Sequence, residues 1–320
     1  MAGARVRLAV LGVLALALAA LPFLADKFYV QLATKILILA IFAMSLDLLV
    51  GYTGLVSLGH AAFFGFAGYL LALVSPQYEA ANLWTSLAIA LAGSAVLALV
   101  IGALVLRTSG IYFIMVTLAF GEMLFHLFHD TSIAGGSDGI YVYVRPVGTI
   151  FGWQPFDFED FTHFYLVVLV AALGVYALLR MVLASPFGRV IVGIRVNEHR
   201  MRSLGYHTFR YKLVCFVLAG TLAGLAGYLA AVQFGVVNPD MLGFHVSASA
   251  LMMLILGGMG TLVGPAIGAA VMMTLELLFQ KITDHWLLPM GVFIVLVALL
   301  LPRGLVGLVT GARAKDDSRG

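Results

Sequence analysis

Three acidic residues, Asp47, Glu122 and Glu276, lie inside long apolar runs of the sequence. A charged side chain inside a bilayer costs several kcal/mol and normally faces a cavity or a partner. Asp47 comes just before a Gly-rich interruption and Glu122 directly follows Gly121, so both can border a route for a polar solute. A structural contact to a neighbouring helix or subunit is the alternative for each of the three. The sequence lacks the series of intramembrane acids and bases typical of proton-coupled transport.

Two further polar side chains, Ser57 and His60, fall in the interruption itself, which reads GYTGLVSLGH at 51–60. Its three glycines free the backbone from helical geometry. Non-helical backbone at membrane depth is tolerated only where protein buries it or where it lines a watery cavity. The stretch is therefore either a gap or gate on the path of a solute, or a tight turn between helices at the cytoplasmic surface. Ser57 and His60 can offer hydrogen bonds to a passing solute, although His60 also fits a structural role.

A third polar stretch, NEHRMRSLGYHTFRYKL at 197–213, is basic and adjoins apolar sequence. Asn197 is a good N-cap and Gly205 is a good C-terminal stop, so a two-turn helix is expected over 198–204. Its small apolar face carries Met201 and Leu204, spaced three residues apart. Charged residues of the same helix accompany that face: Glu198, Arg200 and Arg202.

A helix of two turns is marginal in water by itself, so the membrane surface or another protein must hold it. The negative charge of Glu198, in the first turn, interacts favourably with the helix dipole. One interpretation is a juxtamembrane basic loop that orients the chain and touches anionic lipid. The other is a coupling helix, a short rigid element that inserts into a cleft on a cytoplasmic ATPase and transmits its movement to the membrane spans.

The composition indicates which elements must position these residues. Of 320 residues, 62% are hydrophobic and 10% are charged, and the mean hydropathy is +1.08, which is more apolar surface than a soluble domain of this size can bury. Uncharged runs of about 20 residues match membrane-spanning helices, whereas barrel strands alternate in polarity over about 10 residues. The chain is therefore predicted to be all-α, a polytopic transmembrane helical bundle in a single domain, 1–320.

The apolar runs predict about ten spans, with eight as the lower bound. They are 7–25, 31–50, 60–75, 84–106, 110–129, 163–184, 211–233, 244–258, 261–280 and 285–301. Two of them, 60–75 and 244–258, are short enough to be broken, tilted or re-entrant. The first run resembles a signal peptide because Arg5 and Arg7 precede it, but its length and the charge balance predict a retained helix.

Basic residues indicate the orientation. If the N-terminus is cytoplasmic, fourteen of the 18 Lys and Arg residues lie on the cytoplasmic side, and only Lys27 and Arg145 lie clearly outside. Positive-inside sorting produces this asymmetry, so both termini are expected in the cytoplasm. The net charge of +3 reflects these loops rather than nucleic-acid binding.

Two connections are longer than the others. The outer one, about 130–162, contains AGGSDGI and the acidic-aromatic WQPFDFED. Such a surface suits docking of an external partner, and a loop that stays solvated is the alternative. The inner one, about 185–210, contains the basic stretch.

Glycines at four-residue spacing predict close helix packing. Gly260, Gly264 and Gly268 recur in GGMGTLVGPAIG and place small residues along one helical face. The glycines of the 211–233 span are expected to do the same: Gly220, Gly224 and Gly227. No Lys-Ser/Thr follows a G-x4-G, so the chain lacks a Walker A motif for ATP hydrolysis. The single cysteine, Cys215, excludes an intrachain disulfide, and no group of residues has metal-ligand spacing.

Five stretches of the chain stand out in order: MSLDLLVGYTGLVSLGHAAFFGFAGYL (44–70), GIYFIMVTLAFGEM (110–123), GGSDGI (135–140), GYHTFRYKLVCFVLAGTLAGLAG (205–227) and LGGMGTLVGPAIGAA (256–270). They resemble the successive signature blocks of LivM-type permeases of branched-chain amino acid ABC transporters, in the same order over about 30–305. The Glu198-to-Gly205 spacing also resembles the signature of ABC importer permeases, although EHRMR replaces the Ala-rich start of that signature. ATPase coupling is accordingly expected of six residues: Glu198, Arg200, Met201, Arg202, Leu204 and Gly205.

The resemblance implies an inner-membrane permease subunit of an ABC importer for branched-chain or related amino acids. Its implied partners are a LivH-like second permease, LivG-like and LivF-like ATPase subunits, and an extracytoplasmic solute-binding protein. No cofactor is expected in this chain, because ATP and Mg would bind the ATPases. The candidates for the translocation path are Asp47, Ser57, His60 and Glu122. The alternatives are a sister permease for urea, amides or aromatic acids, a self-sufficient secondary transporter, and a membrane-embedded enzyme.

Overall fold

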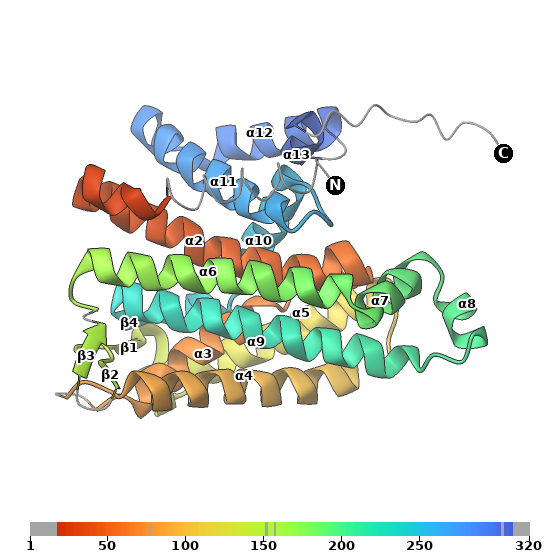
Figure 1. Cartoon of the computed structure of the whole chain (residues 1–320), viewed down its shortest axis with the longest axis horizontal. Helices are drawn as coiled ribbons and strands as arrows, with labels where there is room; N and C mark the ends of the chain where they lie inside the picture. The colour runs from red at the N-terminus through yellow and green to blue at the C-terminus, as the bar shows by residue number, and fades with distance from the viewer. Residues whose placement is uncertain (1–17, 77–78, 151–152, 157, 302–303, 310–320) are drawn as a thin grey trace.

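The structure is a computed structural model that describes residues 18–76, 79–150, 153–156, 158–301 and 304–309. Its long helices form one bundle (Figure 1). Seven segments of the described chain are long and apolar enough to cross a membrane. They are Lys27–Thr53 (α2 Lys27–Asp47 with η1 Leu48–Thr53), Leu83–Val105 (α4), Ile111–Asp130 (α5), Phe161–Ala184 (α6), Thr208–Phe234 (α9), Val263–Ile282 (α11) and Leu287–Gly307 (α12 Leu287–Leu300 with part of α13 Gly304–Val309).

Two apolar helices are shorter than a membrane span. The helices α3 (Ala61–Val74) and α10 (Phe244–Gly257) have 14 residues each. At 1.5 Å per residue each is about 21 Å long, whereas the hydrocarbon core is about 30 Å thick. Seven of the ten expected runs therefore correspond to full spans in the described residues, and 60–75 and 244–258 do not. The first expected span, 7–25, lies mostly outside the described residues.

The two short helices meet head to head inside the bundle. The backbone amide of Ala61, at the start of α3, donates a hydrogen bond to the Oγ of Ser247 in the first turn of α10, at 2.8 Å. Both residues are fully buried. Irregular backbone leads into each helix, over 54–60 before α3 and over 235–243 before α10, where β4 (Val236–Val237) and η4 (Pro239–Leu242) lie. Two of the expected spans are thus half-helices that continue non-helical segments.

One end of the bundle carries the strands, and we call it the strand end. There β1 (Ile140–Tyr141) pairs with β4, and β2 (Gly148–Ile150) pairs with β3 (Trp153–Phe156), all antiparallel. The turns η2 (Ser132–Ala134) and η3 (Gly136–Asp138) precede them. The helices α7 (Pro186–Val196) and α8 (Glu198–Ser203) lie at the opposite end, the α8 end (Figure 1).

The inner connection expected over 185–210 is mostly helical, because α7 occupies its first half. The sequence contained the signal for this helix. Ser185 caps it through an Oγ that accepts the amide hydrogen of Gly188 at 3.3 Å, and Pro186 stands at its first position.

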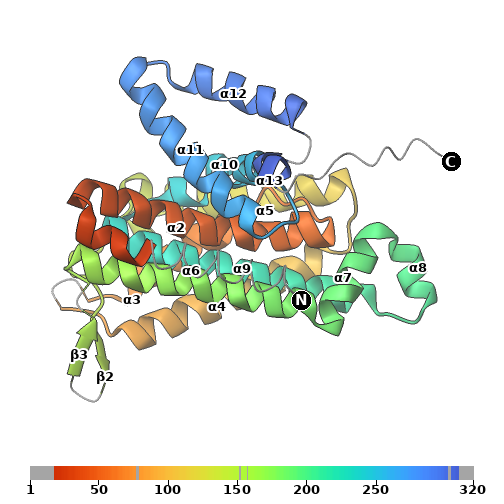
Figure 2. The ribbon, with the colours of Figure 1, turned by 45° about the horizontal axis from the view of Figure 1, so that its top comes forward.

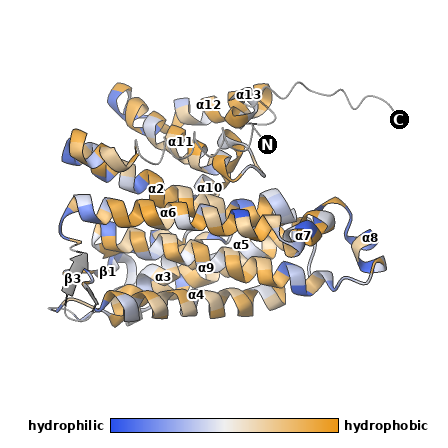
Figure 3. Ribbon diagram, viewed as in Figure 1, coloured by the Kyte–Doolittle hydropathy of each residue, from blue (hydrophilic) through white to orange (hydrophobic). Residues whose placement is uncertain are grey.

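Close backbone contacts place α9 in the core. A side chain at Gly227 would collide with the carbonyl group of Phe64 on α3, and one at Gly224 would collide with Ser94 on α4. Hydrophobic residues lie along most of the length of the outer helices, and hydrophilic residues lie mainly toward the two ends of the bundle (Figure 3). An apolar exterior of this kind is suited to lipid, so the chain is a multi-pass membrane protein.

Candidate functional site

The helix α8 has the boundaries of a capped, rigid element. The Oδ1 of Asn197 accepts the backbone amide hydrogen of Arg200 at 2.9 Å. The helix ends at Ser203, one residue earlier than expected, and Gly205 adopts a φ of 88° just beyond it. A residue with a Cβ is strained at this φ, so glycine provides the stop.

Glu198 ties α8 to the first turns of α9. Its Oε1 accepts hydrogen bonds from Arg202 Nη2 at 2.6 Å and from Thr208 Oγ1 at 2.9 Å, while Lys212 Nζ donates to Oε2 at 3.0 Å. Partial burial alone would raise the pKa of Glu198, but these donors outweigh it and lower the pKa below its ordinary value. We call this group the Glu198 clamp.

Sequence reasoning gave Glu198 a favourable interaction with the helix dipole and a place among the ATPase-coupling residues, but it missed the clamp. Thr208 and Lys212 follow it by 10 and 14 residues, across the turn at Gly205. The rule for neighbours on one helix applies to three- and four-residue spacing, so it identifies Arg202 and neither of the others. The available signal was Lys212 itself, a lysine in the first turns of an apolar span.

The apolar face of α8 borders an open groove between α7, α8 and the start of α9. Met201, Leu204, Phe187 and Tyr206 line this groove of about 480 Å³, and 65% of Leu204 is exposed. Met201 packs so closely on α7 that a Cβ at Gly193 would lie 2.8 Å from its Sδ. The arrangement therefore presents apolar and basic side chains at the end of the bundle on a fixed backbone.

A second polar group links α7 to the Gly-rich interruption. Arg195, in the last turn of α7, donates a hydrogen bond from Nη1 to the backbone carbonyl of Gly51 in η1. The fully buried carboxyl group of Asp47 accepts the amide hydrogens of Gly260 at 2.7 Å and of Leu262 at 3.3 Å. The α8 end is thus connected through hydrogen bonds to the interruption and to the loop before α11.

The interruption itself is π-helical over η1 and then irregular over 54–60. Gly54 is exposed at its turn, whereas Ser57 and His60 are buried. His60 Nε2 hydrogen-bonds Ser45 Oγ at 2.9 Å, and its ring stacks on Phe42 at 5.4 Å between centroids. The segment therefore turns at the surface and then runs back through the protein interior.

Two buried polar atoms in this segment have no hydrogen-bond partner within the described chain: Ser57 Oγ and His60 Nδ1. The backbone of the segment is anchored to α5, because the amide of Leu58 donates to Thr117 Oγ1 at 3.3 Å. Glu122, one turn further along α5, is half-buried. Three of the four path candidates, Asp47, Ser57 and His60, are thus enclosed by the chain's own helices in this conformation.

Of the three glycines at four-residue spacing, Gly264 and Gly268 allow close packing between α11 and the end of α10, as expected, whereas Gly260 does not. A Cβ at Gly268 would collide with the carbonyl oxygen of Met253 on α10, and one at Gly264 would collide with that of Gly258. Gly260 is not on this face, because α11 begins at Val263 and Gly260 lies in the preceding loop with a φ of 77°. Its role is to present its amide to Asp47.

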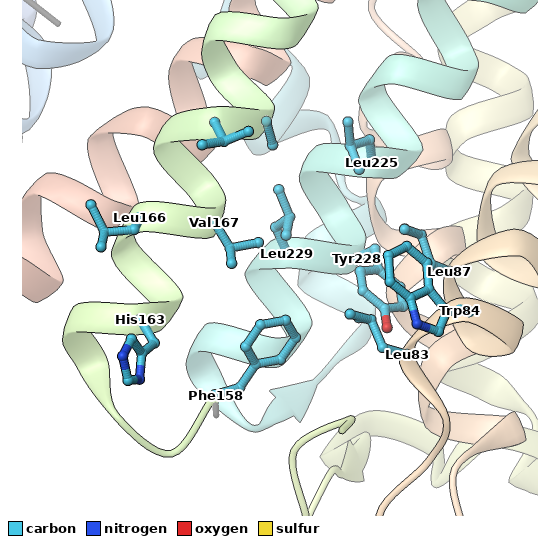
Figure 4. Close-up of a pocket in the computed structure, with 12 residues that line it drawn as sticks. Leu83, Trp84, Leu87, Phe158, His163, Leu166, Val167, Leu225, Tyr228 and Leu229 are labelled. Carbon is cyan, nitrogen blue, oxygen red and sulfur yellow. The ribbon is translucent and has the colours of Figure 1, made fainter. Parts of the chain in front are cut away.

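An apolar pocket of about 390 Å³ lies between α4, α6 and α9 near the strand end (Figure 4). Leu225, Leu229 and Val167 form its wall, and the hydroxyl of Tyr228 is already paired with Ser86 Oγ at 2.8 Å. No charged Lys, Arg, Asp or Glu side chain lines it. No group of three or more His, Cys, Asp or Glu that could hold a metal occurs in the described residues.

The chain is similar to known permease proteins over most of its length. The profile of the family described as branched-chain amino acid transport system / permease component matches residues 28–301. The chain is 32% identical over 306 residues to the high-affinity branched-chain amino acid transport system permease proteins LivM of Salmonella typhimurium and Escherichia coli (strain K12), covering 89% of this chain and 71% of each relative. It is 28% identical over 144 residues to LivH of Salmonella typhimurium, covering 44% of this chain and 46% of that protein. No solved structure matches the chain significantly.

The family match covers most of the chain, including both half-helices, the interruption and the α7–α8 element. It confirms the resemblance seen in the five sequence blocks, and it assigns the chain to transport rather than to catalysis. The chain therefore belongs to the family of permease components of branched-chain amino acid transport systems.

Proposed function

We propose that the chain forms half of the translocation channel of an ABC importer for branched-chain or related amino acids in the cell inner membrane. A LivH-like permease supplies the other half. LivG-like and LivF-like subunits bind and hydrolyse ATP with Mg²⁺, and an extracytoplasmic solute-binding protein delivers the amino acid. This chain itself needs no cofactor.

In this proposal the α8 end and both termini face the cytoplasm, and the strand end faces outward. The basic side chains of α7 and α8 support this orientation under the positive-inside rule. The connection over 131–160, with its short strands, is then the surface on which the loaded binding protein docks.

The Glu198 clamp is the observation that carries the coupling role. It fixes α8 on α9 and so gives a six-residue helix the rigidity that it lacks alone. An ATPase that binds in the groove around Met201 and Leu204 therefore moves α7, α8 and α9 together as one rigid body. The bond from Arg195 to Gly51 passes that movement to the interruption.

Transport by the assembled complex tests the proposal. Vesicles that contain both permeases and both ATPases should take up leucine only with ATP and binding protein present. Leucine uptake by this chain alone, driven by an ion gradient, would indicate a secondary transporter instead. ATP-dependent uptake of urea, amides or aromatic acids without leucine would assign a sister ABC system.

Cysteine labelling tests the orientation independently. Ser137 and Ser203 are exposed at opposite ends of the bundle, and the native Cys215 is fully buried, so it gives little background. A membrane-impermeant thiol reagent should label Ser137→Cys in intact cells and Ser203→Cys only after permeabilisation. The reverse pattern would place α8 outside and remove the coupling role.

A further inference from the structure

A cavity of about 560 Å³ lies between α2, α10, α11 and α12. Its volume falls in the range of about 300–1,000 Å³ that is typical of small-molecule sites. Methionines from three helices form much of its wall: Met252, Met253, Met272, Met273 and Met290. Methionine is flexible and polarisable, so this wall can adapt to apolar groups of different shape.

Two opposite charges line the same cavity, Lys35 of α2 and Glu276 of α11. Both belong to spans and are half-buried. Along the helix axis, Lys35 lies about 12 Å from the start of α2 and Glu276 about 9 Å from the end of α11. Both of these helix ends lie toward the strand-end side of the bundle (Figures 1 and 2). The two charges are therefore placed inside the membrane rather than at its surface.

These two charges do not neutralise each other. Neither forms an ion pair with any residue that the structure describes, and Glu276 has only a hydrogen bond of 3.3 Å from the Gln280 amide. Unpaired ionisable groups at membrane depth are costly and normally mark a path or a ligand site. A ligand that carries both a negative and a positive group satisfies Lys35 and Glu276 together.

The first turn of α10 adds to the positive side of the cavity. His245 and Val246 of this turn and Ser249 of the next turn line the cavity, and the N-cap residue Gly243 has no side chain that could cap the helix. The N-terminus of a helix carries partial positive charge and favours an anion such as a carboxylate. Because α10 is a half-helix that starts inside the bundle, this charge is brought to membrane depth.

We propose that this cavity is a transient site for a zwitterionic α-amino acid with an apolar side chain. Lys35 and the start of α10 hold the carboxylate, Glu276 holds the ammonium group, and the methionine wall receives the side chain. The assignment rests on the proposed import function and names where the substrate contacts this chain.

A neighbouring cavity extends the site toward the strand end. It has about 340 Å³, shares Lys35, and is also lined by Arg145 and by Phe28 from the first turn of α2. Two cations along this route attract a carboxylate. The apolar pocket of Figure 4 lacks such charges, so it does not compete for an amino acid.

Photo-leucine, a diazirine analogue that keeps both charged groups of leucine, tests the site in the assembled complex in nanodiscs. Cross-links are expected on peptides of α10, α11 and α12, and excess leucine should abolish them. Lys35→Gln and Glu276→Gln should each reduce this labelling about tenfold, because each removes a charge-assisted bond. Lys281→Gln, at an exposed position in the last turn of α11, should leave it within about twofold.

Lys35→Arg keeps the charge and should retain most of the labelling, and subunit pull-down shows which variants still assemble. Labelling that is unchanged in both neutral variants, or that is absent from α10 to α12, would overturn the proposal. So would a photoreactive phospholipid that labels these helices while photo-leucine does not. ATP-dependent leucine uptake is measured in parallel. If the wild-type complex takes up leucine but photo-leucine does not label α10 to α12, the cavity is rejected and the import function stands. If the wild-type complex takes up no leucine, the import function itself is rejected.

Discussion

Asp47 Oδ1 accepts a hydrogen bond from the backbone amide of Gly260 at 2.7 Å, although the two residues are separated by 213 positions in the chain. The same carboxyl group accepts the amide hydrogen of Leu262 at 3.3 Å. This side chain thus joins the end of α2 to the loop between α10 and α11. The bond connects two of the sequence blocks that carry the family resemblance, 44–70 and 256–270.

Replacing Asp47 by alanine should destabilise the protein. The buried amide of Leu262 and the half-buried amide of Gly260 would lose their acceptor, at a cost of up to about 1–3 kcal/mol each. The measurement is the unfolding temperature of the detergent-solubilised chain, with Asp138→Ala on the exposed turn η3 as the control. An unfolding temperature equal to that of the control would show that water or a rearranged loop replaces the carboxyl group.

Gly59→Ala should also destabilise, for a steric reason. The added Cβ would overlap the carbonyl oxygen of Thr117 on α5, and backbone cannot move aside as a side chain can. Overpacking of this kind costs about 1–3 kcal/mol. Gly174→Ala on α6 is the matched control, since nothing lies within 4 Å of its added Cβ and alanine favours the helix by about 1 kcal/mol. Equal unfolding temperatures for the two variants would contradict the close contact between 54–60 and α5.

The Glu198 clamp should weaken in acid. Because the folded-state pKa of Glu198 lies below its ordinary value of 4.5, the clamp contributes its full stabilisation above about that pH. The contribution is lost as the pH falls through the lower folded-state pKa. A spin label on Ser203→Cys should therefore be ordered at pH 7 and become mobile only as the pH falls through the folded-state pKa, below 4.5, while a Glu198→Gln background should be mobile throughout. Identical spectra in the two backgrounds at pH 7 would show that other contacts hold α8.

Reversing the charge of Arg200 and Arg202 to Glu should uncouple ATP hydrolysis from transport or prevent ATPase binding. A contact at the centre of a docking interface contributes about 2 kcal/mol or more, which is roughly 30-fold in affinity. Arg202 also belongs to the clamp, so the single variant Arg200→Glu separates docking from loop stability. Arg107→Glu, exposed just after α4, is the control. Substrate-stimulated ATPase activity like that of Arg107→Glu in the double variant would remove both arginines from the coupling role.

Long elements were predictable because a membrane span leaves a strong hydrophobic signal. The ends of α4, α5, α6 and α9 fall within three residues of the predicted ranges. The length of 60–75 and 244–258 also indicated that these runs were broken or re-entrant. The head-to-head contact between Ala61 and Ser247 was not predictable, because no local pattern relates residues 186 positions apart.

For the candidate sites too, features set by neighbouring residues were predictable and contacts between distant segments were not. The cap at Asn197 and the stop at Gly205 follow from rules about neighbouring residues, and α8 obeys them. The partners of Glu198 and Asp47 depend on tertiary packing across a turn or between distant helices. Gly260 was placed on the α11 face because spacing alone cannot tell where a helix begins.

The distance along the chain between the two half-helices has a consequence for synthesis. Translation at about 5–20 residues per second places Ser247 at the ribosome roughly 10–40 s after Ala61. During that interval α3, too short to cross the bilayer by itself, has been made while its partner helix has not. Its retention in the nascent protein must then depend on α4, which packs beside it and is made immediately afterwards. We therefore expect the membrane-insertion machinery to handle α3 and α4 as a pair, with α10 packing against α3 later.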